Sequence, residues 1–197
     1  SSEVDFVVTM VPVGSNVKEI FLENGILTAA SPGTVMIDSS TIDVQSAQTV
    51  HEAAKSAGFN MIDAPVSGGV IGADAGTLTF MCGGDKESFE KAKPILQGMG
   101  KNIVHCGSGG LGQATKICNN MLAGINALAA AEAMTMGQRL GVSPEVLYEV
   151  IATSTGRSYI FETSNPMPNV CSTSPANNKF KPGFMAKLML KDLRLSQ

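Results

Sequence analysis

A lysine and an asparagine stand four residues apart in a stretch of the chain that is typical of a long helix. Lys116 and Asn120 follow a glycine-rich segment at residues 107–112 and begin an Ala- and Met-rich run without proline up to Leu140. Because residues i and i+4 of a helix lie on one face, one turn apart, the amine and the amide can act on the same bound molecule. An amine in such a place is a candidate general acid or base.

A second candidate site follows an expected strand, where Ser67, Gly68 and Gly69 stand in sequence. Consecutive N–H groups of a glycine turn form a concavity that binds anions without a formal positive charge, and the serine adds a hydroxyl. These residues therefore favour a carboxylate-binding corner, although a plain strand-to-loop corner fits them as well. A hydrolase nucleophile elbow is disfavoured, because Pro65 stands where that motif requires glycine.

The glycines at positions 107, 109 and 112 match the G-x-G-x-x-G pattern of dinucleotide-binding turns. That motif needs a second parallel strand about 20 residues later, with an acidic residue at its end for the ribose. Glu132, at about that distance, lies inside the expected long helix. The pattern therefore favours a sharp turn from strand to helix over a nucleotide site at this place.

Composition and charge limit the possible functions of the chain. Its 197 residues, 44% of them hydrophobic, can bury a core and divide into two units. A net charge of −3 without a dense Lys/Arg block predicts no nucleic-acid or membrane partner, and no apolar run approaches the roughly 20 residues of a membrane span. The four cysteines show no metal-ligand spacing and no disulfide pattern, so no metal is expected and a reducing compartment is favoured.

The candidate site residues must be positioned by the helices and strands around them. Up to residue 107, apolar runs alternate with amphipathic stretches, as in an α/β sheet layer. Strands are predicted at residues 4–11, 34–37, 60–64, 78–82 and 103–106. Helices are predicted at 16–22, 44–57 and 85–98, with N-caps supplied by Asn16, the segment 38–41 and Asp85. In this scheme His51 lies on the surface of a helix and His105 in a strand, and neither is expected to be catalytic.

The pattern changes after residue 107, where helices are predicted at 112–140, 144–153 and 181–197 around an irregular loop at 165–178. We therefore predict an α/β protein with a truncated Rossmann-type sheet domain, residues 1–107, followed by an all-helical domain, residues 108–197. A long interdomain helix of roughly 40 Å connects them. Its Ala-rich face predicts packing against a second subunit, as a homodimer or homotetramer.

Taken in order, several motifs resemble the β-hydroxyacid dehydrogenase family over nearly the whole chain. They are Thr9–Pro12, Ile37–Asp43, Asp63–Gly69, Gly112–Asn120, Ser174–Asn178 and Lys191–Leu193. The resemblance implies a NAD-dependent enzyme that binds a small hydroxy-carboxylate. It is strongest to the branch that oxidises 3-hydroxyisobutyrate, from valine breakdown, to methylmalonate semialdehyde.

The resemblance also implies a role for each candidate residue. Lys116 corresponds to the catalytic lysine and Asn120 to the residue that positions the substrate, while Ser67, Gly68 and Gly69 correspond to the carboxylate pocket. A buried place beside the cationic ring of oxidised NAD disfavours the ammonium form of a lysine, which makes a neutral amine base accessible. The residues implied to hold NAD are Val11, Pro12, Asn16, Thr41 and Lys191.

Other functions remain open from the sequence. A phosphogluconate enzyme is disfavoured, because the resemblance would place a histidine three residues after the lysine, where this chain has Asn119. Reductases of glyoxylate, succinic semialdehyde or tartronate semialdehyde fit the same residues, and so does a catalytically silent dimerising scaffold. The resemblance implies the mitochondrial matrix in a eukaryote and the cytoplasm in a bacterium.

The chain departs from the family at its amino-terminal side. The first strand, the true G-x-G-x-x-G turn and the acidic residue after the second strand are not found in it, so we expect a fragment that is also incomplete at its carboxyl end. The choice between NAD and NADP is not decided by the residues present. We expect the chain by itself to bind dinucleotide weakly and to be inactive without the remaining segments.

Overall fold

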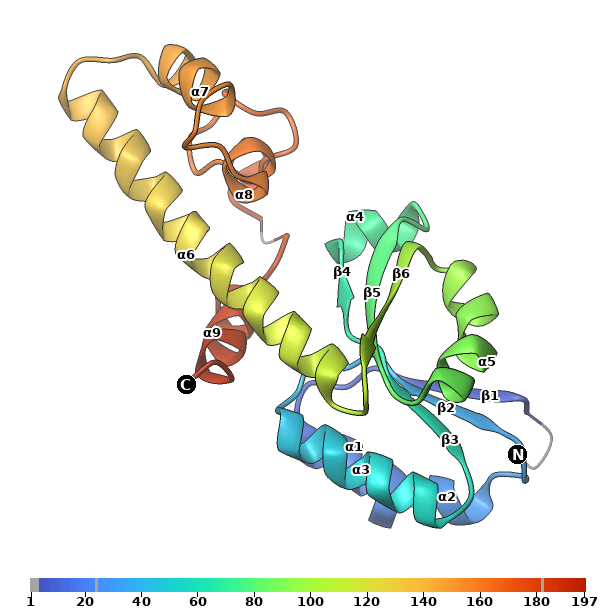
Figure 1. The fold of residues 1–197 in the computed structure, drawn as a ribbon. Coiled ribbons are helices and arrows are strands. Elements are labelled where there is room, and N and C mark those ends of the chain that lie inside the picture. Colours follow the sequence, from blue (N-terminus) through green and yellow to red (C-terminus); the bar gives the residue numbers. More distant parts are fainter. Residues whose placement is uncertain (1–3, 24, 182) are drawn as a thin grey trace. The chain divides into compact units, whose positions relative to one another are not determined.

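The computed structural model describes residues 4–23, 25–181 and 183–197, which form two compact units (Figure 1). The first unit extends to Cys118 and includes Leu195–Gln197, and the second comprises Asn119–Arg194. Helix α6 (Leu111–Arg139) begins in the first unit and continues in the second. The domain boundary expected after residue 107 stays a prediction.

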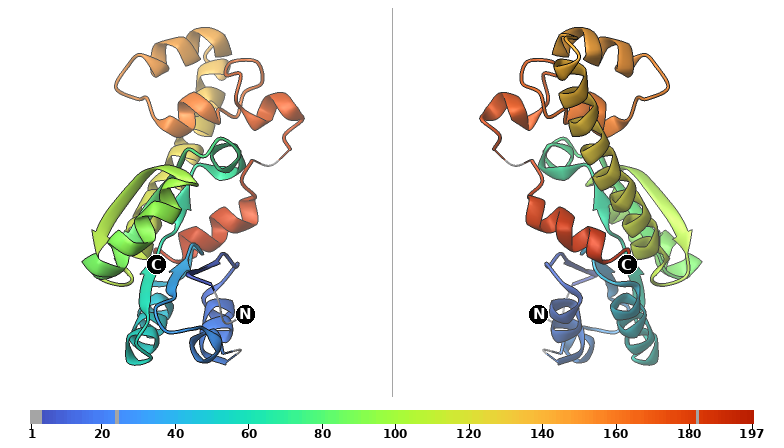
Figure 2. Two further views of the ribbon diagram at one scale, coloured as in Figure 1. Left: turned by 90° about the vertical axis from the view of Figure 1, so that its right-hand side faces the viewer. Right: turned by 90° about the vertical axis from the view of Figure 1, so that its left-hand side faces the viewer.

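The first unit is a sheet with helices on both faces (Figures 1 and 2). Its elements are β1 (Phe6–Thr9), α1 (Gly14–Lys18), the π-helical η1 (Glu19–Glu23), α2 (Ile26–Ala29), β2 (Val35–Asp38), α3 (Val44–Ser56), β3 (Asn60–Asp63), β4 (Val66–Ser67), α4 (Gly69–Asp74), β5 (Leu78–Gly83), α5 (Lys86–Gln97) and β6 (Gly100–Gly107). Strands β1, β2 and β3 are parallel. Strand β5 is antiparallel to β3 and β4 and parallel to β6.

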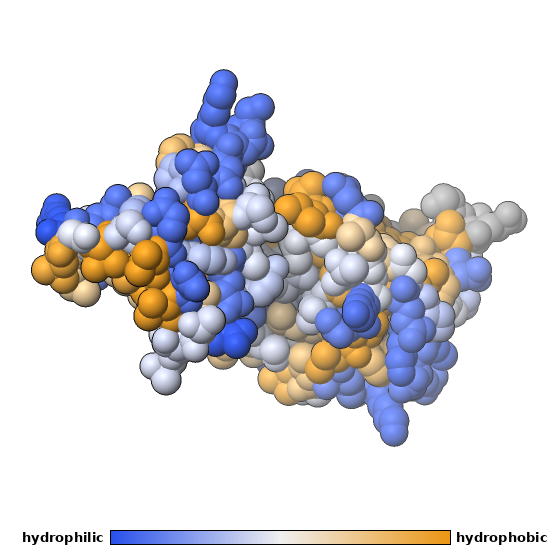
Figure 3. All heavy atoms as spheres, turned by 90° about the horizontal axis from the view of Figure 1, so that it is seen from above, coloured by the Kyte–Doolittle hydropathy of each residue, from blue (hydrophilic) through white to orange (hydrophobic). Residues whose placement is uncertain are grey.

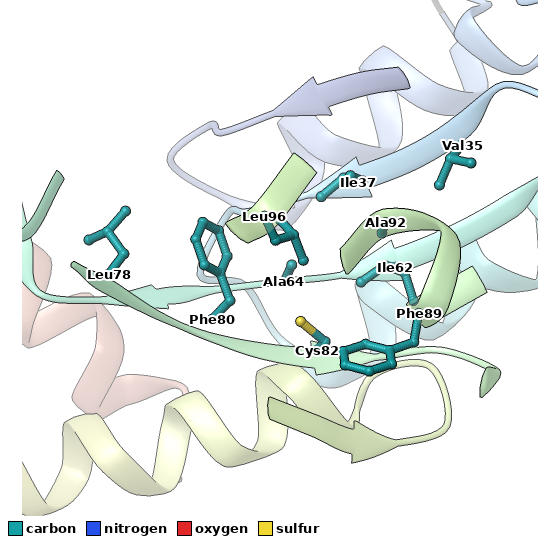
Figure 4. Packing of buried hydrophobic residues seen from close by; sticks show 10 residues of the cluster. All are labelled: Val35, Ile37, Ile62, Ala64, Leu78, Phe80, Cys82, Phe89, Ala92 and Leu96. Carbon is teal, nitrogen blue, oxygen red and sulfur yellow. The ribbon is translucent and has the colours of Figure 1, made fainter. Parts of the chain in front are cut away.

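The alternation of side chains along each strand divides the core between the two faces of the sheet. In β2, Val35 and Ile37 join the cluster that packs against α5, whereas Met36 joins the cluster beneath α1 and α3. The α5-side cluster is drawn in Figure 4 and consists of Val35, Ile37, Ile62, Ala64, Leu78, Phe80, Cys82, Phe89, Ala92 and Leu96. Because both faces are covered at the centre of the sheet, β2 and β5 are buried over nearly their whole length, whereas β6 is largely exposed.

Two helices of this unit, α3 and α5, begin at an aspartate whose side chain caps them. Asp85 accepts a hydrogen bond from the Ser88 N–H (2.8 Å) at the start of α5, so the expected cap is confirmed. Helix α3 is capped by Asp43, which accepts from the Ser46 N–H (2.7 Å), so the cap expected within residues 38–41 is wrong.

The expected cap at Asn16 is also wrong, because α1 begins two residues earlier and Asn16 lies inside it. The N-cap position is held by Val13, whose side chain makes no capping hydrogen bond. A glycine at position 14 explains this start: a Cβ there would lie 2.6 Å from Ser46 Oγ and 2.7 Å from Asp43 Oδ2. Because glycine has no Cβ, α1 can approach the beginning of α3 closely at this position.

The second unit is built around the larger part of α6, together with α7 (Pro144–Ala152), α8 (Tyr159–Thr163), the 3₁₀ turn η2 (Pro175–Asn178) and α9 (Ala186–Arg194) (Figure 1). Its buried cluster joins Ala130 and Met134 of α6 to Phe161 of α8. Helix α8 was not predicted from the sequence. Ser158 caps it, because its hydroxyl accepts a hydrogen bond from the Phe161 N–H. The helix expected at 181–197 is shorter, and residue 182 lies outside the described residues.

Ile62 provides a test of this packing, because its side chain is fully buried on the α5 side of the sheet. We expect Ile62→Ala to lower the free energy of unfolding by about 2–5 kcal/mol through lost burial and a residual cavity. Urea unfolding followed by circular dichroism measures this. The control Ile71→Ala, at an α4 position that is 76% exposed, should change stability by less than about 0.5 kcal/mol, and equal losses would contradict the assignment of the core.

Candidate functional site

The carboxyl ends of the three parallel strands bring polar side chains into one row. Thr9, Asp38 and Asp63 are register partners across β1, β2 and β3. Asp38 Oδ1 accepts hydrogen bonds from Thr9 Oγ1 (2.8 Å) and Ser40 Oγ (2.6 Å), and only 1% of the residue is exposed. Ligands of open α/β sheets bind at this edge, so the row marks the candidate cofactor site.

Ser40 connects the loops that follow β1 and β2. Its hydroxyl donates to Asp38 and accepts a hydrogen bond from the Val11 N–H (2.8 Å). Val11 and Pro12 therefore lie on one loop and Thr41 on the loop beside it, with Asn16 following on α1. The structure brings the expected cofactor residues of the first unit to neighbouring loops at one sheet edge.

The residues of this edge fit a bound dinucleotide. Ser39 follows β2 directly and is 5% exposed, yet its hydroxyl has no hydrogen-bond partner among the described residues. A buried polar group without a protein partner is of the kind that a bound ligand or an ordered water satisfies.

Asp63, the third member of the row, holds the start of α6. Its Oδ1 accepts a hydrogen bond from the Gly110 N–H (2.8 Å) and its Oδ2 from the Gln113 N–H (2.9 Å). The Nε2 atom of His51 lies 2.8 Å from Oδ1. The expectation that His51 is a surface residue is therefore wrong, because its ring contacts the Asp63 carboxylate of β3 and only 15% of the side chain is exposed.

Lys116 is buried, with 7% of the residue exposed, one turn beyond Gln113 on α6. Lysine is almost never buried without a specific environment, because its charged form loses hydration. An amine directed into bulk solvent would have contradicted the proposed chemistry. Lys116 is instead removed from bulk solvent, as the sequence-based hypothesis of a catalytic amine requires.

The serine–glycine corner belongs to the same unit as Lys116. Ser67 is half-buried at the end of β4, where it pairs with Thr79 of β5. Gly68 and Gly69 have φ angles of 136° and 62°, a left-handed conformation that other residues rarely adopt. The corner is therefore a specialised turn.

Asn120 and Lys191 lie in the second unit, where a buried carboxylate connects them. Asn120 Nδ2 donates to Asp192 Oδ2 (2.5 Å), and Lys191 Nζ lies 3.0 Å from Asp192 Oδ1. Asn120 is 5% exposed and Asp192 is 2% exposed. The carboxylate fixes the orientation of the amide, because its oxygen can bond only the NH₂ side of Asn120.

Three residues that organise the site were missed from the sequence: Asp63, Gln113 and Asp192. Each acts on a residue that is distant along the chain, so no local pattern shows the contact. A weak signal was present for Gln113, because glutamine at the third position of a helix is typical of a capping box. Asp192 stands beside Lys191 in a quoted motif, without any feature that indicates burial.

The fold and this edge define a dinucleotide-binding α/β protein, and comparisons with known families identify it further. Residues 1–107 match the NAD binding domain of 6-phosphogluconate dehydrogenase, and residues 110–197 match the NAD-binding domain of NADP-dependent 3-hydroxyisobutyrate dehydrogenase. The chain belongs to the β-hydroxyacid dehydrogenase family. The predicted fold class, family and cofactor NAD are confirmed.

Individual relatives resemble the chain over almost all of its length. The structure of 3-hydroxyisobutyrate dehydrogenase from Mycobacterium tuberculosis with L-serine has 48% identity and a TM-score of 0.93, and the match covers 99% of this chain and 66% of that one. A NAD-dependent L-serine dehydrogenase of Pseudomonas aeruginosa is 45% identical over 98% of this chain and 65% of its own length. A mitochondrial 3-hydroxyisobutyrate dehydrogenase of Pongo abelii is 43% identical over 100% and 59%. The chain thus spans less than two thirds of these relatives.

Within the described ranges, no helix combines the length and apolar character needed to cross a membrane. In the same residues, no group of three or more His, Cys, Asp or Glu side chains could hold a metal ion.

The buried carboxyl of Asp38 predicts a dependence of stability on pH. Burial raises its pKa above the usual value, although hydrogen bonds from Ser40 and Thr9 oppose the shift. The native state then binds a proton more tightly than the unfolded state, so this group lowers stability as pH rises from about 3.9 through the raised native pKa. Asp38→Asn keeps the acceptor oxygen and removes the charge.

We therefore expect the stability of Asp38→Asn relative to the unsubstituted protein to increase as pH rises through this range. Urea unfolding at a series of pH values from 4 to 8 measures the difference. A difference that stays constant with pH would show that the Asp38 carboxyl has the same pKa in the native and unfolded states.

Proposed function

We propose that the protein containing this chain oxidises 3-hydroxyisobutyrate to methylmalonate semialdehyde with NAD, as in valine breakdown. The observation that carries the proposal is a buried lysine, Lys116, on the helix that follows a NAD-binding sheet. The similarity to enzymes named 3-hydroxyisobutyrate dehydrogenase supports the choice of substrate.

In the proposed mechanism, the chain binds the substrate at its carboxylate and moves one proton at its hydroxyl. The N–H groups of Gly68 and Gly69 and the hydroxyl of Ser67 bind the carboxylate, as consecutive N–H donors do. The neutral Nζ of Lys116 accepts the hydroxyl proton as the C–O single bond becomes a carbonyl, and its ammonium returns the proton in the reverse direction. When bound, NAD would supply the acceptor for the hydride that leaves the carbinol carbon. The Asn120 amide, oriented by Asp192, positions the substrate.

The proposed cofactor residues come from the loops at the sheet edge and from α9. Val11 and Pro12 follow β1, Thr41 follows β2, and Asn16 lies on α1. Lys191 extends from α9, where Asp192 lies beside it. These residues supply backbone groups, short polar side chains and one cation, the types that bind a dinucleotide.

L-serine is the second candidate substrate, because one relative is named for its oxidation and another was determined with it. L-serine and 3-hydroxyisobutyrate both carry a hydroxymethyl group on the carbon next to the carboxylate, and they differ in an ammonium or a methyl group at that carbon. Reduction of glyoxylate, succinic semialdehyde or tartronate semialdehyde would use the same residues. A catalytically silent scaffold would reduce NAD with none of the corresponding alcohols.

The assignment of Lys116 is tested by Lys116→Ala in the full-length protein. We expect kcat for 3-hydroxyisobutyrate to fall by roughly 10²–10⁴-fold, the usual contribution of a positioned acid or base, with little change in NAD affinity. Reduction of NAD is followed by absorbance with 3-hydroxyisobutyrate, L-serine, glycerate, 4-hydroxybutyrate and β-hydroxybutyrate in parallel.

The matched control is Lys101→Ala, which removes an exposed amine from β6 and should leave kcat unchanged. Near-normal turnover of Lys116→Ala would refute the role of the lysine. A preference for L-serine would replace the proposed substrate, and no reduction with any alcohol would favour the scaffold.

We also propose that α6 packs against a second copy of the chain in a homodimer or homotetramer. Leu122, Ile125 and Leu128 are 57%, 54% and 63% exposed, and their spacing puts them on one side of the helix with Met136, which is 61% exposed. Hydrophobic side chains are visible among polar ones on the face drawn in Figure 3. Exposed apolar stripes of this kind mark protein–protein interfaces.

For this interface we expect Leu128→Glu to shift the protein toward the monomer, because association would bury a charge against apolar side chains. Analytical ultracentrifugation over a range of concentrations measures the change. Ile71→Glu, at an exposed position of α4, is the control. An unsubstituted protein that is monomeric at all concentrations, or an unchanged oligomer in Leu128→Glu, would contradict the proposal.

The compartment proposed for the protein is the mitochondrial matrix in a eukaryote and the cytoplasm in a bacterium. The name of the Pongo abelii relative supports the first of these for a eukaryotic source.

A further inference from the structure

The N-cap position of helix α6 is a glycine, whereas most helices have a capping side chain there. The first N–H groups of a helix have no partners within it, and a Ser, Thr, Asp or Asn at the N-cap normally satisfies one of them. Gly110, directly before α6, has no side chain for this purpose. Asp63 supplies the cap from β3, with one carboxylate oxygen on the Gly110 N–H and the other on the Gln113 N–H.

The packing around this cap leaves little room for movement. A Cβ atom added at Gly112 would collide with the backbone oxygen of Met81 and with Asp63, and one at Gly109 would meet the ring of His51. These glycines bring the first turn of α6 into direct contact with the end of β3. The glycine pattern that resembles a nucleotide-binding turn therefore has a packing role in this structure.

Because Asp63 occupies the N-cap N–H, the side chain of Gln113 is available for another contact. In a capping box, glutamine at this position would bond back to that N–H. Here the fully buried Gln113 accepts a hydrogen bond from the Ile42 N–H (3.0 Å) and donates one to the Ser40 carbonyl oxygen (2.8 Å). Ser40 and Ile42 flank Thr41, so Gln113 holds the backbone on both sides of that residue.

We propose that Asp63 and Gln113 are positioning residues for the reaction. Asp63 fixes the first turn of α6, and thereby Lys116, while Gln113 fixes the Thr41 loop relative to the same turn. The proposal rests on the proposed roles of Lys116 as acid and base and of Thr41 in NAD binding. Lys116 stands three residues beyond Gln113, so a tilt of this turn moves its amine, and misplacements of about 1 Å can cost 10²-fold in rate.

The two residues should affect different steps, and this separates positioning from a purely structural role. In Asp63→Asn only one oxygen can accept a hydrogen bond from the start of α6. The new NH₂ group faces one of the two backbone N–H donors, at Gly110 or Gln113, so the start of α6 shifts. We expect kcat to fall by about 10²-fold with a smaller change in NAD affinity. In Gln113→Ala the Thr41 loop loses two buried hydrogen bonds, and we expect the Kd for NAD to rise by about tenfold or more while kcat changes less.

The experiment measures kcat by absorbance and the Kd for NAD by isothermal titration calorimetry in the full-length protein. Asp85→Asn is the matched control, because the hydrogen bonds of Asp85 are to Ser88 and Glu87 at the start of α5 in the same unit. We expect it to lower the unfolding midpoint and to leave kcat and the Kd unchanged. If Asp63→Asn fails to fold, Gln113→Met keeps the side-chain volume without the hydrogen bonds and should raise the Kd as Gln113→Ala does.

The proposal is overturned if the variants at positions 63 and 113 lose stability but retain the kcat and Kd of the unsubstituted protein, as Asp85→Asn is expected to do. Failure of the proposed function looks different, because either Lys116→Ala would keep its turnover or the unsubstituted protein would oxidise none of the alcohols. The Kd for NAD can be measured without turnover. The Gln113 variants therefore test whether this side chain positions the Thr41 loop even if the proposed reaction is wrong.

Discussion

A carboxylate buried at the end of a strand loses its hydration, and only hydrogen-bond donors at fixed positions can offset that loss. Asp63 has such donors in the N–H groups at the start of α6 and in His51 of α3. The contact is strong because the carboxylate also faces the positive end of a helix of 29 residues. The end of β3, the middle of α3 and the start of α6 must therefore keep one mutual arrangement.

A second buried acid at the same edge of the sheet, Asp38, has different hydrogen-bond donors. Its oxygen accepts from the hydroxyls of Thr9 and Ser40, which can rotate, instead of from N–H groups of a helix. Burial therefore raises the pKa of Asp38 in spite of these bonds. One buried acid organises a helix, while the other connects the two loops on which the proposed cofactor residues lie.

Local patterns in the sequence predicted the parts of the fold that depend on local physics. The apolar run that predicted a strand at 34–37, the cap at Asp85 and the one-turn spacing of Lys116 and Asn120 are all properties of a few consecutive residues. The caps at Asn16 and within residues 38–41 were predicted wrongly, because tertiary packing of Gly14 against α3 and a nearby Asp43 decided the helix starts. The contacts that Asp63, Gln113 and Asp192 make at the start of α6, at the Thr41 loop and at Asn120 join residues 47 to 73 positions apart, so no local pattern could indicate them.

Two of the three residues missed from the sequence share a chemical feature. Asp63 and Asp192 are buried carboxylates that accept from N–H groups of α6, the first from its backbone and the second from the Asn120 side chain. A carboxylate has no donor of its own when ionised, so its bonds specify the orientation of an amide without an alternative flipped state. An asparagine in the same place could present either its oxygen or its NH₂ group. Asp63 therefore fixes the first turn of α6 in the first unit, and Asp192 fixes the Asn120 side chain in the second. Residues of a proposed active site need such fixed positions more than they need additional stability.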